Sequence, residues 1–331
     1  MGDVAMTIPV LSALTKQYPE LKITVLTRAF FSPMFSQFPN VHVFEADVKG
    51  KHKGIFGLWR LYKELNCLPI DAIADLHNVL RSNILKYFFT LSGIKTIQID
   101  KGRTEKKALT AKKNKNFKAL TTTHERYVDV FKKLDFPITL ENTPLLVKQA
   151  LNKPTQQIIG DTSKIWIGIA PFAAFKGKMY PLVLMKEVIH LLESTDKYKI
   201  LLFGGGSVEQ AQLAKLENTY ESCINLAGKL SFKEELAIIS NLDIMLAMDS
   251  GNAHLAAMYA IPTVTLWGVT HPYAGFYPFQ QEENVLLANR TQFPLIPTSI
   301  YGNKFPEGYD KAITTILPET VFHKIEEVVS K

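Results

Sequence analysis

The feature that most constrains the fold is a regular alternation of short β-branched runs with longer amphipathic segments. In the first 136 residues, the expected strands are KITVLT (22–27), NVHVFEA (40–46), DAIADL (71–76) and TIQI (96–99). Between and around them, apolar residues at helical spacing predict helices over 9–18, 55–66, 81–93 and 124–136. Strands that alternate with helices predict a parallel sheet covered on both faces.

The same alternation restarts after a polar, proline-marked stretch at 138–163, which we interpret as an interdomain connection. The expected strands of the second series are 164–172, 197–206, 223–228, 242–248 and 262–268, and the expected helices are 181–195, 207–218, 231–241 and 249–260. We therefore predict two Rossmann-like domains, 1–150 and 151–331, with the final helix packing back on the first. Ligands are expected where loops leave the carboxyl ends of the strands.

Composition limits the class of protein. A chain of 331 residues with 47% hydrophobic and 21% charged residues has ample material for two soluble cores. No apolar run reaches the roughly 18 residues of a spanning helix, and the N-terminus lacks a signal pattern. Cys67 and Cys223 match no metal or disulfide spacing, which is typical of reduced thiols in a cytoplasmic protein.

The positive charge is concentrated in the first half of the chain. Residues 1–150 hold 23 Lys and Arg against 13 Asp and Glu, and KGRTEKKALTAKKNKNFK (101–118) holds eight basic residues and one acid. Such a run is either a solvated face or an attractor for an anionic partner: a phosphorylated glycan, a membrane surface or a nucleic acid. Nucleic acid is the weakest of these alternatives, because no known nucleic-acid-binding motif surrounds the run.

The most informative stretch is MDSGNAHLAAMYAIPTVTLWG (248–268), where an expected strand runs directly into Asp249, Ser250 and Gly251 and a helix begins. Small residues at such a turn let phosphates approach backbone N–H groups at the positive helix end. Two alternatives stay open: Ser250 can simply cap the helix, and His254, one turn further, is either structural or a ligand contact.

Two further loops leave expected strands. In APFAAFKGKMYP (170–181), the ammonium groups of Lys176 and Lys178 suit a diphosphate, although solvated lysines are the simpler interpretation. In LLFGGGSVEQ (201–210), glycines permit close backbone approach and Glu209 could accept hydrogen bonds from a ribose. The spacing does not match the dinucleotide-binding fingerprint.

Taken together, these loops resemble the heptosyltransferase-type glycosyltransferases, family nine of the sugar transferases. The resemblance is carried by DSGNAHLAAMYAIPTVTLWG, by KMYP and by the opening GDVAMTIPVLSAL, with support from DLHNVLRS (75–82) and HERYVDVF (124–131). It implies a GT-B fold: two Rossmann-like domains, the first receiving the acceptor and the second a nucleotide-sugar. It also implies an inverting, metal-independent reaction without a cofactor, and the sequence has no Asp-x-Asp.

The resemblance also implies roles for individual residues. Asp3 matches the catalytic base and Lys178 the lysine that contacts donor phosphate. Other expected donor-binding residues are Ala173, Ala174, Glu209, Asp249, Ser250, Gly251 and His254. On the acceptor side we expect Gly2, Arg81 and His124, together with Lys112, Lys113 and Lys115 of the basic segment.

The implied donor is a nucleoside-diphosphate heptose or similar sugar, and the resemblance implies that the nucleotide is ADP. The implied acceptor is a lipopolysaccharide core or related anionic glycan. The implied location is the cytoplasm, with contact at the inner membrane and no nucleic-acid partner. Ala173 and Ala174 stand where ADP-heptose enzymes often carry hydroxyl residues. Two alternatives remain: a nucleotide-sugar epimerase on the same scaffold, and a non-catalytic nucleotide-sugar-binding relative.

The opening MGDVAMTIPVLSAL begins on a turn, whereas relatives place a hydrophobic strand before this Gly-Asp. We therefore expect the natural product to begin upstream of Met1 and the sheet to be open beside residues 22–27. Asp3 would then lie on a turn without its anchoring strand, which would weaken activity.

Overall fold

The protein is described by a computed structural model that covers residues 1–160 and 163–331 and divides into two compact units. The first unit contains Met1, residues 3–103 and residues 121–145, and the second contains Gly2, residues 104–120 and residues 146–331. The predicted connection at 138–163 includes two residues that lie outside the described part. The observed division falls at Leu145 and Leu146, five residues before the predicted domain boundary.

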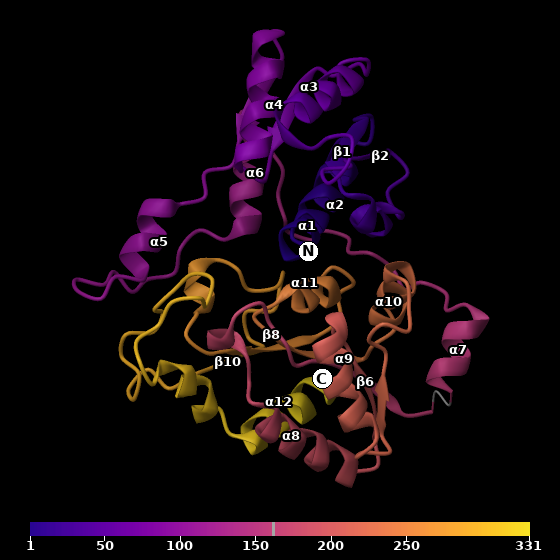
Figure 1. The fold of residues 1–331 in the computed structure, drawn as a ribbon, viewed down its shortest axis with the longest axis vertical. Coiled ribbons are helices and arrows are strands. Elements are labelled where there is room, and N and C mark those ends of the chain that lie inside the picture. Colours follow the sequence, from indigo (N-terminus) through magenta and orange to yellow (C-terminus); the bar gives the residue numbers. More distant parts are fainter. Residues whose placement is uncertain (161–162) are drawn as a thin grey trace. The chain divides into compact units, whose positions relative to one another are not determined.

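In the first unit, parallel strands alternate with helices as expected (Figure 1). Its elements are α1 (Gly2–Ala5), α2 (Thr7–Gln17), β1 (Ile23–Thr27), η1 (Ala29–Phe35), β2 (Val41–Glu45), α3 (Gly54–Leu65), β3 (Ala72–Asp75), α4 (Leu80–Leu91), β4 (Lys95–Gln98) and α6 (Thr123–Lys133). Helix α6 begins at a capping box, in which Thr122 and Glu125 each satisfy the other's backbone N–H.

The four strands of the first unit form two separate parallel pairs, β1 with β2 and β3 with β4. Strand β1 alternates between half-buried and exposed residues, and Leu26 is 38% exposed. A central parallel strand is normally buried on both faces. The described strands of the first unit therefore do not form one continuous sheet.

The second unit is built on one continuous parallel sheet of six strands, in the order β10-β9-β8-β5-β6-β7. Its elements are α5 (Arg103–Leu109), α7 (Lys153–Ile159), β5 (Ile165–Ala170), η2 (Lys176–Lys178), α8 (Leu182–Ser194), β6 (Tyr198–Leu202), α9 (Gly206–Glu217), β7 (Cys223–Asn225), α10 (Phe232–Ile239), β8 (Ile244–Met248), α11 (Gly251–Ala257), β9 (Thr263–Trp267), η3 (Pro272–Ala274), β10 (Val285–Leu287), η4 (Tyr309–Thr315) and α12 (Pro318–Val329). Every residue of β8 and β9 is buried, as a strand covered on both faces requires.

The final helix, α12, was expected to pack on the first domain, and that prediction is wrong. Its buried residues Val321, Ile325 and Val328 join the core of the second unit. There α12 packs against α8 and β8, and Figure 1 shows α12 and α8 side by side. The reason is hydrophobic: one face of α12 is apolar, and the sheet of its own unit offers apolar surface to cover it.

The basic segment 104–120 also lies in a different place from the one predicted. It was assigned to the first domain, but it packs with the second unit, where Leu109 and Leu120 form a cluster with Ala274. Leu120 N–H donates to the carbonyl of Tyr273 at 2.9 Å, and the guanidinium of Arg290 lies 3.4 Å from the ring centroid of Phe117. The apolar residues scattered through the lysine run, rather than its charge, decide which unit it joins.

Candidate functional site

Three loops gather at the carboxyl edge of the six-stranded sheet. They follow β8, β5 and β6, which are neighbours in the sheet, so the loops that begin at residues 249, 171 and 203 leave adjacent strands. This edge is where open parallel sheets bind ligands. It carries all the residues that were predicted to bind the donor.

Lys178 is held at this edge by Asp249. The Lys178 Nζ lies 2.7 Å from Asp249 Oδ2 and donates to the Asp249 backbone carbonyl at 3.0 Å. Thr270 Oγ1 donates to the same carboxylate oxygen at 2.9 Å. The side chains of Lys178 and Asp249 are only 15% and 7% exposed. The pair fixes the ammonium in position and leaves one of its three N–H donors for a ligand.

Gly302 closes over the lysine. It has a φ of +77°, and a Cβ at this position would come within 2.6 Å of Lys178 Cγ. Glycine is therefore needed both for the left-handed backbone and for the space that the lysine stem occupies. The sequence analysis missed Gly302 and Thr270, because both lie far from Lys178 in the chain.

Three buried polar atoms at the start of α11 have no hydrogen-bond partner within the described residues: Ser250 Oγ, Asn252 Oδ1 and His254 Nδ1. Ser250 is the N-cap residue of α11 by its backbone, but its side chain makes no cap hydrogen bond. Buried polar atoms are normally paired, so these three groups are candidates for hydrogen bonds to a ligand. Asn252 was not predicted, although it stands inside the DSGN motif.

His254 is neutral at physiological pH. Burial and the nearby positive charge of Lys178 lower its pKa to about 3. A neutral imidazole can offer one donor and one acceptor to a ligand. Gly2 lies against this ring, since a Cβ on Gly2 would approach His254 Cδ2 to 3.2 Å. Gly2 was predicted on the acceptor side, but it packs with the second unit.

The remaining predicted donor residues lie at the same edge in different settings. Glu209 stands in the first turn of α9, and its Oε2 accepts from the Gly205 N–H at 2.7 Å. Ala173 packs against the core, and Ala174 is exposed. Lys176, offered in sequence analysis as a second phosphate contact, instead pairs with Asp310 at 2.8 Å. The Lys176 ammonium is therefore already paired with a carboxylate at the protein surface.

Asp3, the predicted base, lies in the first turn of α1 with its side chain 65% exposed. Within the first unit, its Oδ2 is 4.0 Å from His77 Nε2, and its backbone carbonyl accepts from the Tyr127 hydroxyl at 3.3 Å. Burial and the charge of Asp3 raise the pKa of that tyrosine. The carboxylate is thus open to solvent while its backbone is anchored.

The predicted acceptor residues of the first unit are not alike. Arg81 is exposed near the start of α4, whereas His124 is 3% exposed inside α6. Near them, Asp75 ends β3 and was not predicted. Its Oδ1 accepts from the backbone N–H groups of His77 and Asn78, at 3.0 and 2.8 Å, and its buried Oδ2 has no partner in the described chain.

The three lysines of the basic segment divide into two kinds. Lys112 and Lys113 are exposed, as expected of an attracting surface. Lys115 is not: its Nζ donates to the carbonyls of Leu109 and Pro297 at 3.0 and 2.7 Å. Burial and the charge of Arg290 lower the pKa of Lys115 to about 8. Lys115 therefore tethers the segment, which is a correction to its predicted role in acceptor binding.

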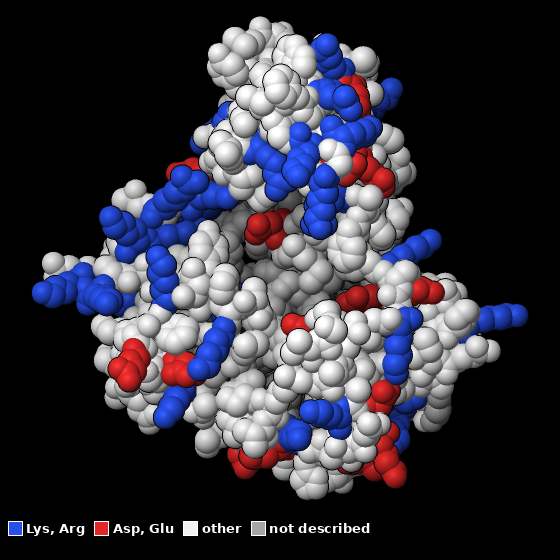
Figure 2. All heavy atoms as spheres, in the orientation of Figure 1, with Lys and Arg blue, Asp and Glu red and all other residues white. Residues whose placement is uncertain are grey.

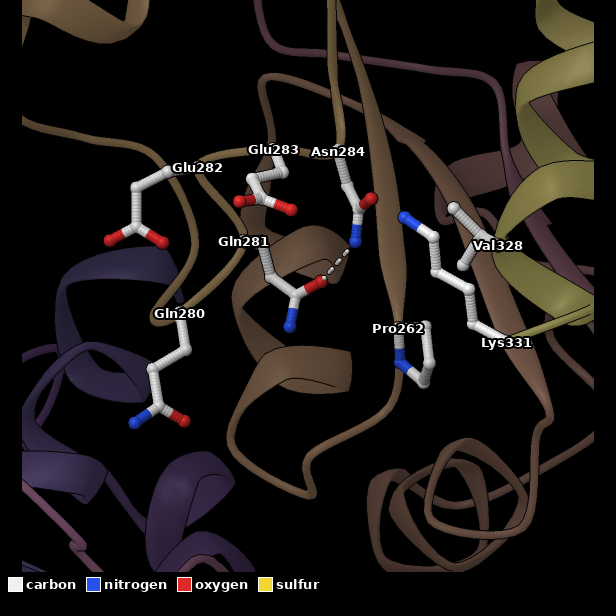
Figure 3. A pocket seen from close by; sticks show the side chains of 8 residues that line it. All are labelled: Pro262, Gln280, Gln281, Glu282, Glu283, Asn284, Val328 and Lys331. Carbon is white, nitrogen blue, oxygen red and sulfur yellow. Dashed lines mark hydrogen bonds between the residues drawn. The ribbon is translucent and has the colours of Figure 1, made fainter.

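A separate cavity of about 430 Å³ lies elsewhere in the second unit (Figure 3). It is lined by Pro262, Asn284 and Lys331, with residues 280–283 and Val328. Pro262 and Asn284 immediately precede β9 and β10, so this cavity is at the amino edge of the sheet, away from Lys178. Because ligands of parallel sheets bind at the carboxyl edge, we do not assign the donor to it.

Two solved glycosyltransferase structures have the same architecture as this chain. A glycosyl transferase family 9 structure from Veillonella parvula covers 100% of this chain and 94% of its own, at 21% identity and a TM-score of 0.76. The E. coli ADP-heptose lps heptosyltransferase II covers 98% and 95%, at 18% identity and a TM-score of 0.67. The fold is that of the GT-B glycosyltransferases.

The sequence comparison specifies the family. The family described as "Glycosyltransferase family 9 (heptosyltransferase)" matches residues 58–296, and the chain belongs to it. A relative from Haemophilus influenzae, "Lipooligosaccharide heptosyltransferase 2", is 26% identical over 100% of this chain and 97% of its own length. The protein is a glycosyltransferase of the heptosyltransferase type, which favours the transferase interpretation over the epimerase.

Among the helices of residues 1–160 and 163–331, none is long and apolar enough to cross a membrane. In the same residues, no group of three or more His, Cys, Asp and Glu side chains could hold a metal ion.

Proposed function

We propose that the protein transfers heptose from ADP-heptose to a lipopolysaccharide or lipooligosaccharide core acceptor, with inversion and without a metal ion. The names of the relatives supply the sugar, the nucleotide and the acceptor class. The observation that carries the proposal is Lys178, held by Asp249 beside three buried polar atoms that lack partners. A fixed ammonium with unsatisfied hydrogen-bonding groups suits a diphosphate and its attached sugar.

In this proposal, the acceptor hydroxyl attacks the anomeric carbon while the bond from that carbon to the diphosphate oxygen breaks. Asp3 takes the hydroxyl proton, and general-base help of this kind is worth roughly 10²–10⁴-fold. The negative charge that develops on the leaving ADP is met by the ammonium of Lys178 and by polar groups at the start of α11. A single displacement inverts the anomeric centre.

Ser250, Asn252 and neutral His254 would hydrogen-bond the diphosphate or the sugar, and Glu209 the ribose. The first unit would receive the acceptor, with exposed Arg81 on that side, whereas buried His124 would act only through the packing of α6. Exposed Lys112 and Lys113 would attract the anionic glycan. We place the reaction in the cytoplasm, at the inner face of the membrane that holds the lipid-linked acceptor.

The decisive experiment separates donor binding from transfer. We expect ADP-heptose and ADP to stabilise the protein against heat, since a ligand at 100 times its Kd adds about 2.7 kcal/mol. Asp3→Asn should keep this stabilisation and lose transfer by roughly 10²-fold or more. Lys178→Met should lose the stabilisation. Because the Asp3 side chain is 65% exposed, its substitution leaves the packing intact.

The alternatives give different results. Conversion of a nucleotide-sugar in the absence of any acceptor would identify an epimerase. Donor binding without transfer to any core acceptor would identify a non-catalytic relative. Stronger stabilisation by UDP-sugars than by ADP-sugars would contradict the proposed donor.

A further inference from the structure

Helix α3 turns an unusual face to solvent. Its buried residues, Leu58, Leu61 and Leu65, lie on one side and contact the core of the first unit. At 100° per residue, the opposite side carries Ile55, Phe56, Trp59, Arg60 and Lys63, all of them exposed. The outer face of a surface helix is normally polar. Here it is apolar and basic, with Phe56 88% exposed and Ile55 60% exposed.

Helix α4 repeats this arrangement. Its buried residues are Leu85 and Phe89, yet Leu80, Tyr87 and Leu91 line the opposite side and are 77%, 62% and 69% exposed. These three residues are separated by seven and four positions, so they form one stripe along the helix. Neither the packing of α4 on its own unit nor any capping interaction accounts for this outer stripe.

Aromatic contacts join the two helices. The ring of Trp59 meets that of Phe88 edge to face at a centroid distance of 5.0 Å, and Tyr62 meets Phe89 in the same way at 5.0 Å. The outer face of α3 and the outer stripe of α4 therefore belong to one packed pair of helices. We refer to Ile55, Phe56, Trp59, Tyr87 and Leu91 as the α3/α4 apolar surface.

The charged residues of α3 and α4 are basic with one exception. Helix α4 contains no acidic residue, and the one acid of α3, Glu64, already pairs with Lys51 and His52 at 3.1 and 3.2 Å. Lys63 Nζ lies over the ring of Trp59 at 5.6 Å. Figure 2 shows uncharged surface at the top, over α4, with Lys and Arg side chains gathered beside it.

We propose that the α3/α4 apolar surface docks the protein on the anionic surface of a phospholipid bilayer. Aromatic and aliphatic side chains would enter the headgroup boundary, and Arg60 and Lys63 would contact lipid phosphates. Exposed apolar patches with such surroundings mark interaction sites. A second copy of the chain fits less well, because a two-fold contact would set the basic residues of this face against their own copies.

This inference rests on the surface alone and does not depend on the proposed transfer reaction. It assigns the membrane contact to elements of the first unit, on a surface separate from the basic segment. The test can therefore use lipid vesicles without any sugar substrate, so its failure would leave the proposed function untouched.

Trp59 provides a built-in reporter. It is 44% exposed, whereas Trp166 and Trp267 are 6% and 1% exposed, and the chain has three tryptophans. We would measure tryptophan emission and co-sedimentation with vesicles of phosphatidylcholine, with and without phosphatidylglycerol. We expect binding and a blue shift with phosphatidylglycerol, both reduced by salt, and no blue shift in Trp59→Phe.

Three double variants distinguish binding through the α3/α4 apolar surface from non-specific electrostatic attraction of the protein to anionic lipid. Phe56→Ser/Tyr87→Ser should weaken vesicle binding at least about tenfold, because it removes two largely exposed rings from the inserted apolar surface. Its circular dichroism and unfolding temperature should match those of the wild type, since both side chains are largely exposed. Arg60→Glu/Lys63→Glu changes the charge of the proposed surface. Its matched control is Lys112→Glu/Lys113→Glu, which makes the same change of charge on the basic segment.

Three results would overturn the proposal. The first is wild-type vesicle binding by Phe56→Ser/Tyr87→Ser. The second is loss of binding in Lys112→Glu/Lys113→Glu but not in Arg60→Glu/Lys63→Glu, which would assign the contact to the basic segment. The third is lipid-independent self-association of the wild type that Phe56→Ser/Tyr87→Ser abolishes, which would make the surface a protein interface.

Discussion

The ion pair between Lys178 and Asp249 should be separable into a stabilising and a ligand-binding contribution. Both side chains are nearly buried, at 15% and 7% exposure, and Thr270 also donates to the carboxylate. Asp249→Asn leaves the ammonium without its counter-charge. Removing one partner of a buried pair costs about 3–5 kcal/mol, and we expect the lower end because the lysine still reaches solvent.

For a unit of this size, about 3 kcal/mol corresponds to a fall in Tm of roughly 6–12 °C. The emission of Trp166 and Trp267, both buried in the second unit, reports its unfolding. The Tm of Lys178→Met should fall by a similar amount. Thr270→Val removes one hydrogen bond, worth about 1 kcal/mol, and serves as the control that leaves the ion pair in place.

The double variant Lys178→Met/Asp249→Asn distinguishes the two contributions. It removes both charges, and a neutral pair of similar volume is often as stable as the ion pair it replaces. We therefore expect its Tm to recover most of the loss while ADP binding, measured by calorimetry, stays absent. An unchanged Tm in Asp249→Asn would refute the stabilising role. Wild-type ADP affinity in the double variant would refute the assignment of Lys178 as the phosphate contact.

Three further predictions concern single residues. Burial raises the pKa of the Glu235 carboxyl from 4.5 to about 7. The folded state therefore loses stability as the pH rises through this range, by up to about 3 kcal/mol at pH 8. Glu235→Gln should raise the unfolding temperature at pH 8 and leave it unchanged at pH 4. Gly302→Ala should lower Tm, because the left-handed backbone at this position costs alanine about 1–2 kcal/mol. It should also lower ADP affinity, because the new methyl group would clash with the Lys178 side chain. A normal ADP affinity would contradict this prediction. In thiol labelling of the native protein, exposed Cys67 should react quickly and Cys223 only on unfolding, since burial raises the pKa of Cys223 to about 12; equal rates would be inconsistent with the structure.

The sequence alone predicted most of the secondary structure and which loops follow the strands of the second sheet. Hydrophobic period distinguishes strands from helices locally, so β5, β8, β9 and the helices between them fall within a few residues of prediction. The edge of the sheet that binds ligands follows from parallel topology, because every loop after a strand emerges on the same side. Motif residues such as Ser250 and His254 were found in this way.

Tertiary structure decided what depends on partners distant in the chain. No local pattern shows that Lys176 pairs with Asp310 and Lys178 with Asp249, because the two lysines lie in the same loop and have the same side chain. Nor does charge show that Lys115 is a tether, because its acceptors include a carbonyl 182 residues away. The position of α12 and of segment 104–120 likewise depends on which apolar surface each can cover. The sequence determines which groups a site contains, but burial and long-range pairing determine which of them remain available to a substrate.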